Sequence, residues 1–271
     1  MGNQIWINTL RLVISGLILE INDPDRTVEL SLPPAHRKFS LAGNTENMFG
    51  SVGSGKLQLE VIDKEIPPEM SMAESLVITD IFEISEKPSG DLRFYAPRQI
   101  PPRVIEIDRQ FQYGQVIGNF SEFAGKPHYP LQYIDIVLFS NWLASFGDVI
   151  LHSAGVDIAG KGYCFMGKSG VGKSTLSNLL SKNRTVTLLG EDQVILRYLN
   201  GRFWIFGTPW HVNPEVCSPK GVPLEKIFFL TRNDTELRKA VQPAEGYKRI
   251  LQNSFIPFYR KKLIYEIIKK I

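Results

Sequence analysis

Residues 167–174 of this chain read Gly167-Lys168-Ser169-Gly170-Val171-Gly172-Lys173-Ser174. The stretch matches the pattern G-x-x-x-x-G-K-[ST] in full. Glycines let a backbone wrap closely around an anion, so that successive N–H groups point inward at phosphates. We predict that Lys173 reaches the β- and γ-phosphates of a nucleotide and that the Ser174 hydroxyl binds Mg²⁺. The predicted nucleotide-binding residues are Gly167, Lys168, Ser169, Gly170, Val171, Gly172, Lys173, Ser174 and Thr175.

The residues on either side of this stretch support the prediction. Tyr163–Met166 is an apolar run typical of a strand, and Thr175–Lys182 has the leucine spacing of a short helix. A strand, a glycine loop and a helix beginning at about Lys173 is the order that phosphate binding requires. A second stretch, Gly50–Lys56, also fits G-x-x-x-x-G-K, but Leu57 replaces the hydroxyl residue and a strand pattern follows. We therefore predict a loop without a phosphate at Gly50–Lys56.

Composition limits the remaining classes of protein. The chain has 271 residues, enough for one or two domains. Its 31 Lys and Arg against 28 Asp and Glu give a net charge of +3, too small an excess for a dedicated nucleic-acid-binding protein. The longest uncharged apolar stretch, Ile136–Phe146, is shorter than the roughly 20 residues of a membrane span. With two cysteines and no leader pattern, we expect a cytoplasmic protein without a nucleic-acid or membrane partner.

The sequence changes character near residue 130. Before it, the chain looks β-rich: Leu10–Ile21 is apolar with a bend at Gly16, and Leu57–Val61 alternates apolar with polar residues. Gly125–Pro130 carries two prolines and a glycine and is the predicted linker. We predict a β-rich domain over residues 1–125, with a role in acceptor recognition, and an α/β nucleotide-binding domain over 131–271.

The second domain shows interleaved strand and helix signals. Asn200-Gly201 between two apolar runs is a strong signal for a hairpin. The predicted strands are His152–Ile158, Tyr163–Met166, Arg184–Leu189, Val194–Leu199, Arg202–Phe206 and Ile227–Leu230, and the predicted helices are Leu131–Ala144, Thr175–Lys182, Tyr247–Gln252 and Lys261–Lys270.

Two adjacent acids follow the strand after the phosphate loop. The run Arg184–Leu189 ends at Gly190-Glu191-Asp192. Carboxylates at the carboxyl end of such a strand are placed to hold Mg²⁺ or to act as a base, and either acid could take either role. His152 and His211 taken alone have the pattern of structural histidines.

A longer combination of motifs resembles a known family. Leu151-His152-Ser153-Ala154-Gly155-Val156-Asp157-Ile158, then Gly160-Lys161-Gly162, Gly167–Ser174 and Glu191-Asp192, is similar to the HPr kinase/phosphorylase family. That family shares its nucleotide-binding fold with the ATP-dependent phosphoenolpyruvate carboxykinases. The resemblance covers roughly residues 130–210 and implies a P-loop kinase domain of this type, with a smaller β-rich N-terminal domain.

The resemblance also implies roles for individual residues. Glu191 would take the proton from a serine hydroxyl with His152 beside it, while Asp192 and Ser174 would hold Mg²⁺. In the carboxykinases the corresponding histidine is a metal ligand, so His152 could play either part. The family usually has two aspartates where this chain has Glu191 and Asp192, so the division of labour stays open and Glu191 is also a candidate metal ligand.

The resemblance is closer to one branch of the family. The basic, glycine-containing C-terminal signature of the bifunctional enzymes is not found, and the N-terminal half does not resemble theirs. The chain is more similar to divergent members in bacterial peptide-tailoring clusters, including serine kinases of lasso-peptide precursors. Gly207-Thr208-Pro209-Trp210-His211 and Pro223–Leu230 fit that group.

The leading hypothesis is an ATP- and Mg²⁺-dependent kinase for a serine hydroxyl of a peptide or small protein, with Lys173, His152, Glu191 and Asp192 as catalytic residues. A metabolite kinase or carboxykinase-like enzyme is the second hypothesis, and it requires Arg and Lys side chains to converge on a small anion. A nucleotide-gated binding module without transfer activity is the third. A homo-oligomer is left open.

Overall fold

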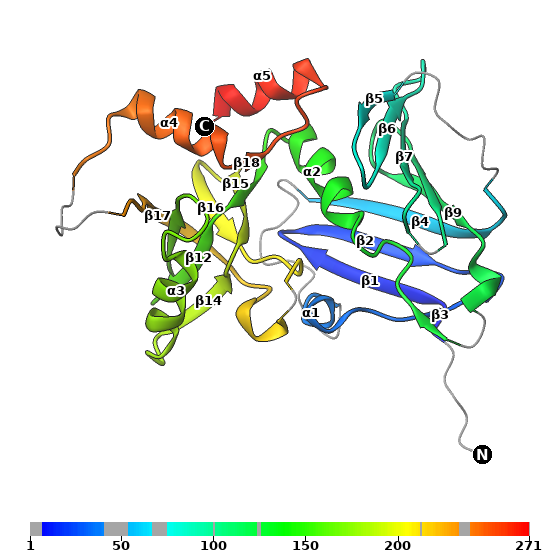
Figure 1. Ribbon diagram of the computed structural model, residues 1–271, viewed down its shortest axis with the longest axis horizontal. Helices are drawn as coiled ribbons and strands as arrows, with labels where there is room; N and C mark the ends of the chain where they lie inside the picture. Colours follow the sequence, from blue (N-terminus) through cyan, green and yellow to red (C-terminus); the bar gives the residue numbers. More distant parts are fainter. Residues whose placement is uncertain are drawn as a thin grey trace. The chain divides into compact units, whose positions relative to one another are not determined.

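The computed structural model describes residues 7–40, 54–66, 75–99, 101–123, 126–211, 213–232 and 239–270. Over these residues the protein is a mixed α/β structure with several sheets and few helices (Figure 1). The chain divides into two compact units, Met1–Pro33 with Ser40–Ile136 and Pro34–Phe39 with Val137–Ile271. Within the described ranges, no helix has the length and apolar character needed to span a bilayer.

The first unit is built on an eight-stranded sheet with the strand order β1-β2-β4-β9-β8-β7-β6-β5. β2, β4 and β9 run parallel to one another, and the other neighbours are antiparallel. The strands are β1 (Thr9–Ile14), β2 (Leu17–Asn22), β4 (Gly55–Asp63), β5 (Ser75–Ile78), β6 (Glu83–Glu86), β7 (Leu92–Ala96), β8 (Arg103–Ile107) and β9 (Tyr113–Gly118).

Local patterns correctly predicted strand structure in β1, β2 and β4 and the turn between the first two. The bend at Gly16 is confirmed, because β1 and β2 form a hairpin in which Ser15 and Gly16 take φ values of 53° and 85°. These left-handed values are typical of a two-residue hairpin turn. Alternation on β4 is also confirmed, since Leu57, Leu59 and Val61 are buried and the residues between them are not. The loop predicted at Gly50–Lys56 is wrong for its last two residues, because Gly55 and Lys56 begin β4, whereas Gly50–Gly53 lie outside the described residues.

The segment predicted as a linker packs inside the first unit. Gly125 lies outside the described residues, but β10 (Pro127–His128) pairs in parallel with β3 (Glu29–Leu30). The next residue, Tyr129, is 4% exposed. The buried guanidinium of Arg103 donates hydrogen bonds to the backbone carbonyls of Tyr129 and Pro130. Because these contacts tie the segment to β3 and β8, the change of unit falls later, after Ile136.

The second unit contains another eight-stranded sheet, in the order β14-β12-β13-β17-β16-β15-β11-β18. The pair β13–β17 is parallel, and the remaining pairs are antiparallel. The strands are β11 (Val149–His152), β12 (Ala154–Ile158), β13 (Lys161–Met166), β14 (Val186–Gly190), β15 (Gln193–Leu199), β16 (Arg202–Phe206), β17 (Gly221–Phe229) and β18 (Ser254–Phe255).

Helices cover both faces of this sheet. On β13, Cys164 and Met166 belong to an apolar cluster that includes residues of α4 and α5, whereas Phe165 belongs to a cluster that includes residues of α3. Neighbouring residues of a strand point to opposite faces, so α3 lies on one face and α4 and α5 on the other. The longer helices are α2 (Asp135–Ser145), α3 (Lys173–Ser181), α4 (Pro243–Gln252) and α5 (Lys261–Lys270), and α1 (Pro34–Arg37) is a single turn.

One predicted strand is wrong in its extent. The sequence pattern predicted a continuous strand over His152–Ile158, but the structure interrupts it at Ser153. β11 ends at His152 and pairs with β15, whereas β12 begins at Ala154 and pairs with β13 and β14. His152 therefore ends a strand instead of beginning one. Ser153 is fully buried and its hydroxyl donates to the carbonyls of Ala154 (2.9 Å) or Phe165 (3.2 Å), which stabilises the change of partner.

A buried ion pair gives the first prediction. The Asp148 carboxylate lies 2.8 Å from Nε of Arg197, with side chains 2% and 1% exposed, and also contacts Lys270 of α5. Asp148→Ala leaves the Arg197 charge buried without its partner, so the free energy of unfolding should fall by about 3–5 kcal/mol. Urea denaturation measures the change. Lys161→Ala, which removes an exposed pair with Glu225, should cost only about 0–1 kcal/mol. Equal losses would contradict the assignment.

His128 gives a second prediction, for the pH dependence of stability. Burial, together with the nearby Arg103 charge, lowers the pKa of His128 from 6.5 to about 4. The unfolded chain therefore takes up a proton at higher pH than the folded protein does. His128 should contribute stability that is fully present above pH 6.5 and is lost as the pH falls toward 4. Thermal unfolding of His128→Gln across this window should show a shallower pH dependence than the wild type, and an unchanged slope would exclude the effect.

Candidate functional site

The predicted strand, loop and helix around residue 170 are present. β13 ends at Met166 and α3 begins at Lys173, at the predicted position. Gly170 and Gly172 take φ values of 76° and 104°, and a Cβ at either position would meet no atom within 4 Å. The glycines are thus required by backbone conformation and not by packing. Left-handed residues in such a loop turn successive N–H groups toward one point, which with the helix N-terminus forms a cradle for an anion.

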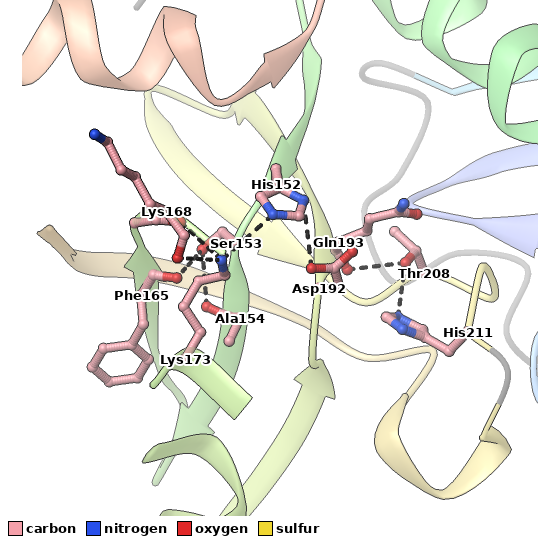
Figure 2. Close-up of polar contacts among 11 residues, drawn as sticks. His152, Ser153, Ala154, Phe165, Lys168, Lys173, Asp192, Gln193, Thr208 and His211 are labelled. Atoms are coloured by element: carbon pink, nitrogen blue, oxygen red, sulfur yellow. Dashed lines mark hydrogen bonds and ion pairs between the residues drawn. The ribbon is translucent and has the colours of Figure 1, made fainter. Parts of the chain in front are cut away.

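Lys173 folds back onto this loop. Lys173 is only 7% exposed, and its Nζ donates a hydrogen bond to the carbonyl oxygen of Gly167 at 2.8 Å. The same Nζ is 3.5 Å from the carbonyl oxygen of Lys168 and 3.4 Å from Nε2 of His152 (Figure 2). These are neutral acceptors, so the ammonium group is held in place without being neutralised.

His152 lies between Lys173 and an acid, as Figure 2 shows. Its Nδ1 is 3.4 Å from Oδ1 of Asp192. His152 ends β11 and Asp192 lies in the turn after β14, so this contact joins the two segments. An ammonium group only donates, so Nε2 of His152 must accept from Lys173. A neutral His152 then carries its hydrogen on Nδ1, the ring nitrogen that faces Asp192. The three side chains form one row of contacts, from Lys173 through His152 to Asp192.

The acid that contacts His152 is Asp192. The resemblance to the HPr kinase family had implied Glu191 beside this histidine. Glu191 is half-buried in the same turn, whereas the Asp192 side chain is 54% exposed. Ser174 and Thr175 lie exposed on the first turn of α3. The structure thus brings Lys173, His152 and Asp192 into contact.

A second histidine joins the same region from a loop after β16. Nε2 of His211 is 3.2 Å from the hydroxyl of Thr208, which in turn contacts the carbonyl oxygen of Gln193 (Figure 2). Burial lowers the pKa of His211 to about 4, and the nearby Asp192 opposes that shift. The sequence pattern around His211, taken alone, indicated a structural histidine.

The donor groups present suit Mg²⁺ and a nucleotide. Among the residues that the structure describes, no three His, Cys, Asp or Glu side chains are grouped to bind a metal ion. Mg²⁺ does not need such a group when it accompanies a nucleotide, because one or two carboxylates, phosphate oxygens and water complete its shell. The hydroxyl of Ser174 and the carboxylate of Asp192 are oxygen donors of the right kind, and the glycine loop provides N–H groups for phosphates.

A cavity of about 610 Å³ borders the glycine loop. It lies between the loop, the end of β17 and α4, and its size is within the usual range for a small-molecule site. Its basic side chains are Lys168, Arg232, Lys248 and Arg249. Arg249 also pairs with Glu245 at 2.7 Å and stacks over Phe229. By contrast, the guanidinium of Arg197 pairs with the buried carboxylate of Asp148.

Comparison of the sequence with protein-family models and with curated proteins finds no match.

The glycine loop gives a third prediction, with a matched control. Gly170→Ala and Gly160→Ala both place a side chain at positive φ (76° and 82°) in open space. Each should destabilise the protein by roughly 1–2 kcal/mol through backbone strain alone. Only Gly170 belongs to the predicted phosphate cradle, since Gly160 lies in the β12–β13 turn. Stabilisation by ATP or pyrophosphate in thermal unfolding should therefore weaken in Gly170→Ala and persist in Gly160→Ala. Equal behaviour of the two variants would argue against the cradle.

Proposed function

We propose that the protein is an ATP- and Mg²⁺-dependent kinase that phosphorylates a serine hydroxyl of a peptide or small protein, with a P-loop kinase fold of the HPr kinase type in its second unit. The observation that carries the proposal is the contact chain from Lys173 through His152 to Asp192 at the mouth of the glycine loop. A phosphate cradle alone supports nucleotide binding. A histidine oriented by a carboxylate next to that cradle also supports chemistry on a hydroxyl group.

The residues divide the work by charge. The loop N–H groups and the Lys173 ammonium group offset the negative charge of the phosphates, which is the main requirement in phosphoryl transfer. Ser174 and Asp192 would hold Mg²⁺, which when bound would neutralise further charge on the phosphates. Lys173 must turn from His152 toward the phosphates to do its part. Nε2 of His152 is then free to accept the hydrogen of the acceptor hydroxyl, while Asp192 holds the imidazole through Nδ1.

A metabolite kinase is the second candidate, and one observation favours it. Among the described residues that line the cavity beside the loop, four side chains are cationic, Lys168, Arg232, Lys248 and Arg249, and one is acidic, Glu245. That excess of positive charge suits an anionic acceptor as well as a nucleotide. A peptide serine remains the leading acceptor because of the sequence resemblance over residues 130–210.

Transfer assays give the fourth prediction. The protein is incubated with ATP, Mg²⁺ and either serine-containing peptides or small anionic hydroxyl compounds, and mass spectrometry measures addition of a phosphoryl group. Lys173→Ala should lower kcat by at least about 100-fold, because it removes a charge aimed at the transferred group. Lys161→Ala, an exposed lysine in the β12–β13 hairpin, is the matched control and should retain full activity.

The outcomes separate the hypotheses. Labelled peptide supports the serine kinase, and labelled metabolite alone supports the second candidate. Binding of ATP without transfer to any acceptor favours a nucleotide-gated binding module. Lys173→Ala protein that transfers phosphate at the wild-type rate rules out the proposed mechanism.

A further inference from the structure

The loop that carries His211 is built to approach the acidic turn closely. A Cβ on Gly207 would lie 1.9 Å from the carbonyl oxygen of Ser218 and 2.4 Å from that of Leu189, so the loop leaves β16 pressed against the end of β14. A Cβ on Gly190 would lie 3.1 Å from Nε2 of His211. Side chains at these two positions would push the loop and the acidic turn apart. The placement of His211 beside Asp192 therefore depends on both glycines.

The donors and acceptors of Thr208 and His211 fix the direction of the hydrogen bonds in this loop. Thr208 is fully buried, and its hydroxyl donates its single proton to the carbonyl oxygen of Gln193 at 2.9 Å. Its oxygen can then only accept from the ring of His211. Nε2 of His211 consequently carries a hydrogen, whether the ring is neutral or charged. The chain runs from His211 through Thr208 to the peptide carbonyl of Gln193.

This chain ends on the backbone that holds Asp192. The carbonyl oxygen of Asp192 itself accepts from the N–H of Ser153 at 2.9 Å, on the side of the β11–β12 break. The next carbonyl, of Gln193, accepts from Thr208 on the other side. The carbonyls of Asp192 and Gln193 are thus hydrogen-bonded to two different segments. The Asp192 side chain faces His152.

We propose that His211 is a positioning residue that acts through Thr208 to hold Asp192 toward the phosphate loop. The inference rests on the proposed function, in which Asp192 orients His152 and holds the cation. His211 does not touch the reacting groups in this assignment. Its contribution is to keep the Thr208 hydroxyl aligned on the Gln193 carbonyl, because a hydroxyl that accepts a hydrogen bond donates a stronger one.

The test measures Mn²⁺ binding in the presence of ADP, by the loss of the free-ion signal in electron paramagnetic resonance, alongside kcat and KM. His211→Ala and Thr208→Val should each weaken Mn²⁺ binding about tenfold, the lower end of the effect of residues that support a metal ligand. The double variant should be no weaker than either single one, because both changes break one chain. In transfer assays kcat should fall while KM for ATP stays within about twofold, since the loop cradle is untouched.

Conservative variants separate positioning from folding. His211→Gln can present an amide N–H near the position of Nε2, and Thr208→Ser keeps the hydroxyl, so each should recover most of the loss. Tyr259→Phe removes a partly buried hydrogen bond to Asn141 of α2, which is distant in sequence from the acidic turn. This variant controls for general destabilisation. If His211→Ala and Thr208→Val bind Mn²⁺ as the wild type does, the positioning role of His211 is contradicted but the proposed function is not. A wild-type protein that binds no Mn²⁺ with ADP overturns the proposed function and the inference together.

Discussion

The hydrogen bond from the N–H of Ser153 to the carbonyl oxygen of Asp192 is the contact on which the geometry of the candidate site depends. It forms at the point where the chain stops pairing with β15 and starts pairing with β13 and β14. Because of that change, His152 lies at the end of β11. It is close to the glycine loop that follows the β12–β13 hairpin. The same bond fixes the acidic turn against the break, so one backbone contact helps to set the distance between His152 and Asp192.

The ammonium group of Lys173 has no negatively charged partner among its hydrogen bonds within the described part of the chain. A nearly buried ammonium group costs free energy unless a negative charge compensates it. Within the described part of the chain, its hydrogen-bond partners are two carbonyls and the His152 ring. Under the proposed function, a bound phosphate supplies the missing charge. Nucleotide binding would then both neutralise Lys173 and release Nε2 of His152, which links occupancy of the cradle to the readiness of the base.

The sequence predicted those features that depend on a few adjacent residues. Asn200 and Gly201 both take positive φ (52° and 80°), a local preference that is visible as a dipeptide and is confirmed in the β15–β16 hairpin. The glycine loop and the start of α3 at Lys173 were predicted for the same reason. The break at Ser153 was not, because His152–Ile158 has an uninterrupted strand pattern and only the partners on either side differ.

Other features escaped prediction because their cause is distant in the chain. The prolines of Lys126–Pro130 indicate a linker, yet the carbonyls of this segment serve the buried Arg103 of β8. His211 lies beside Asp192 because Gly190 and Gly207 permit close approach, and a glycine in a sequence does not name its neighbour. Contacts of this kind need the folded sheet, which brings the ends of β14 and β16 together.

The burial of the site residues follows the demands on each of them. Thr208 and Ser153, which hold backbone, are fully buried, whereas the side chains of His152 and Asp192 are 36% and 54% exposed. A reacting group must meet its substrate, so it cannot be enclosed, but its geometry must be held within about half an ångström. Under the proposed function, buried hydroxyls behind the partly exposed His152 and Asp192 meet both requirements. The supporting residues therefore belong to the interior of the second unit, and the groups to which we assign chemistry lie nearer its surface.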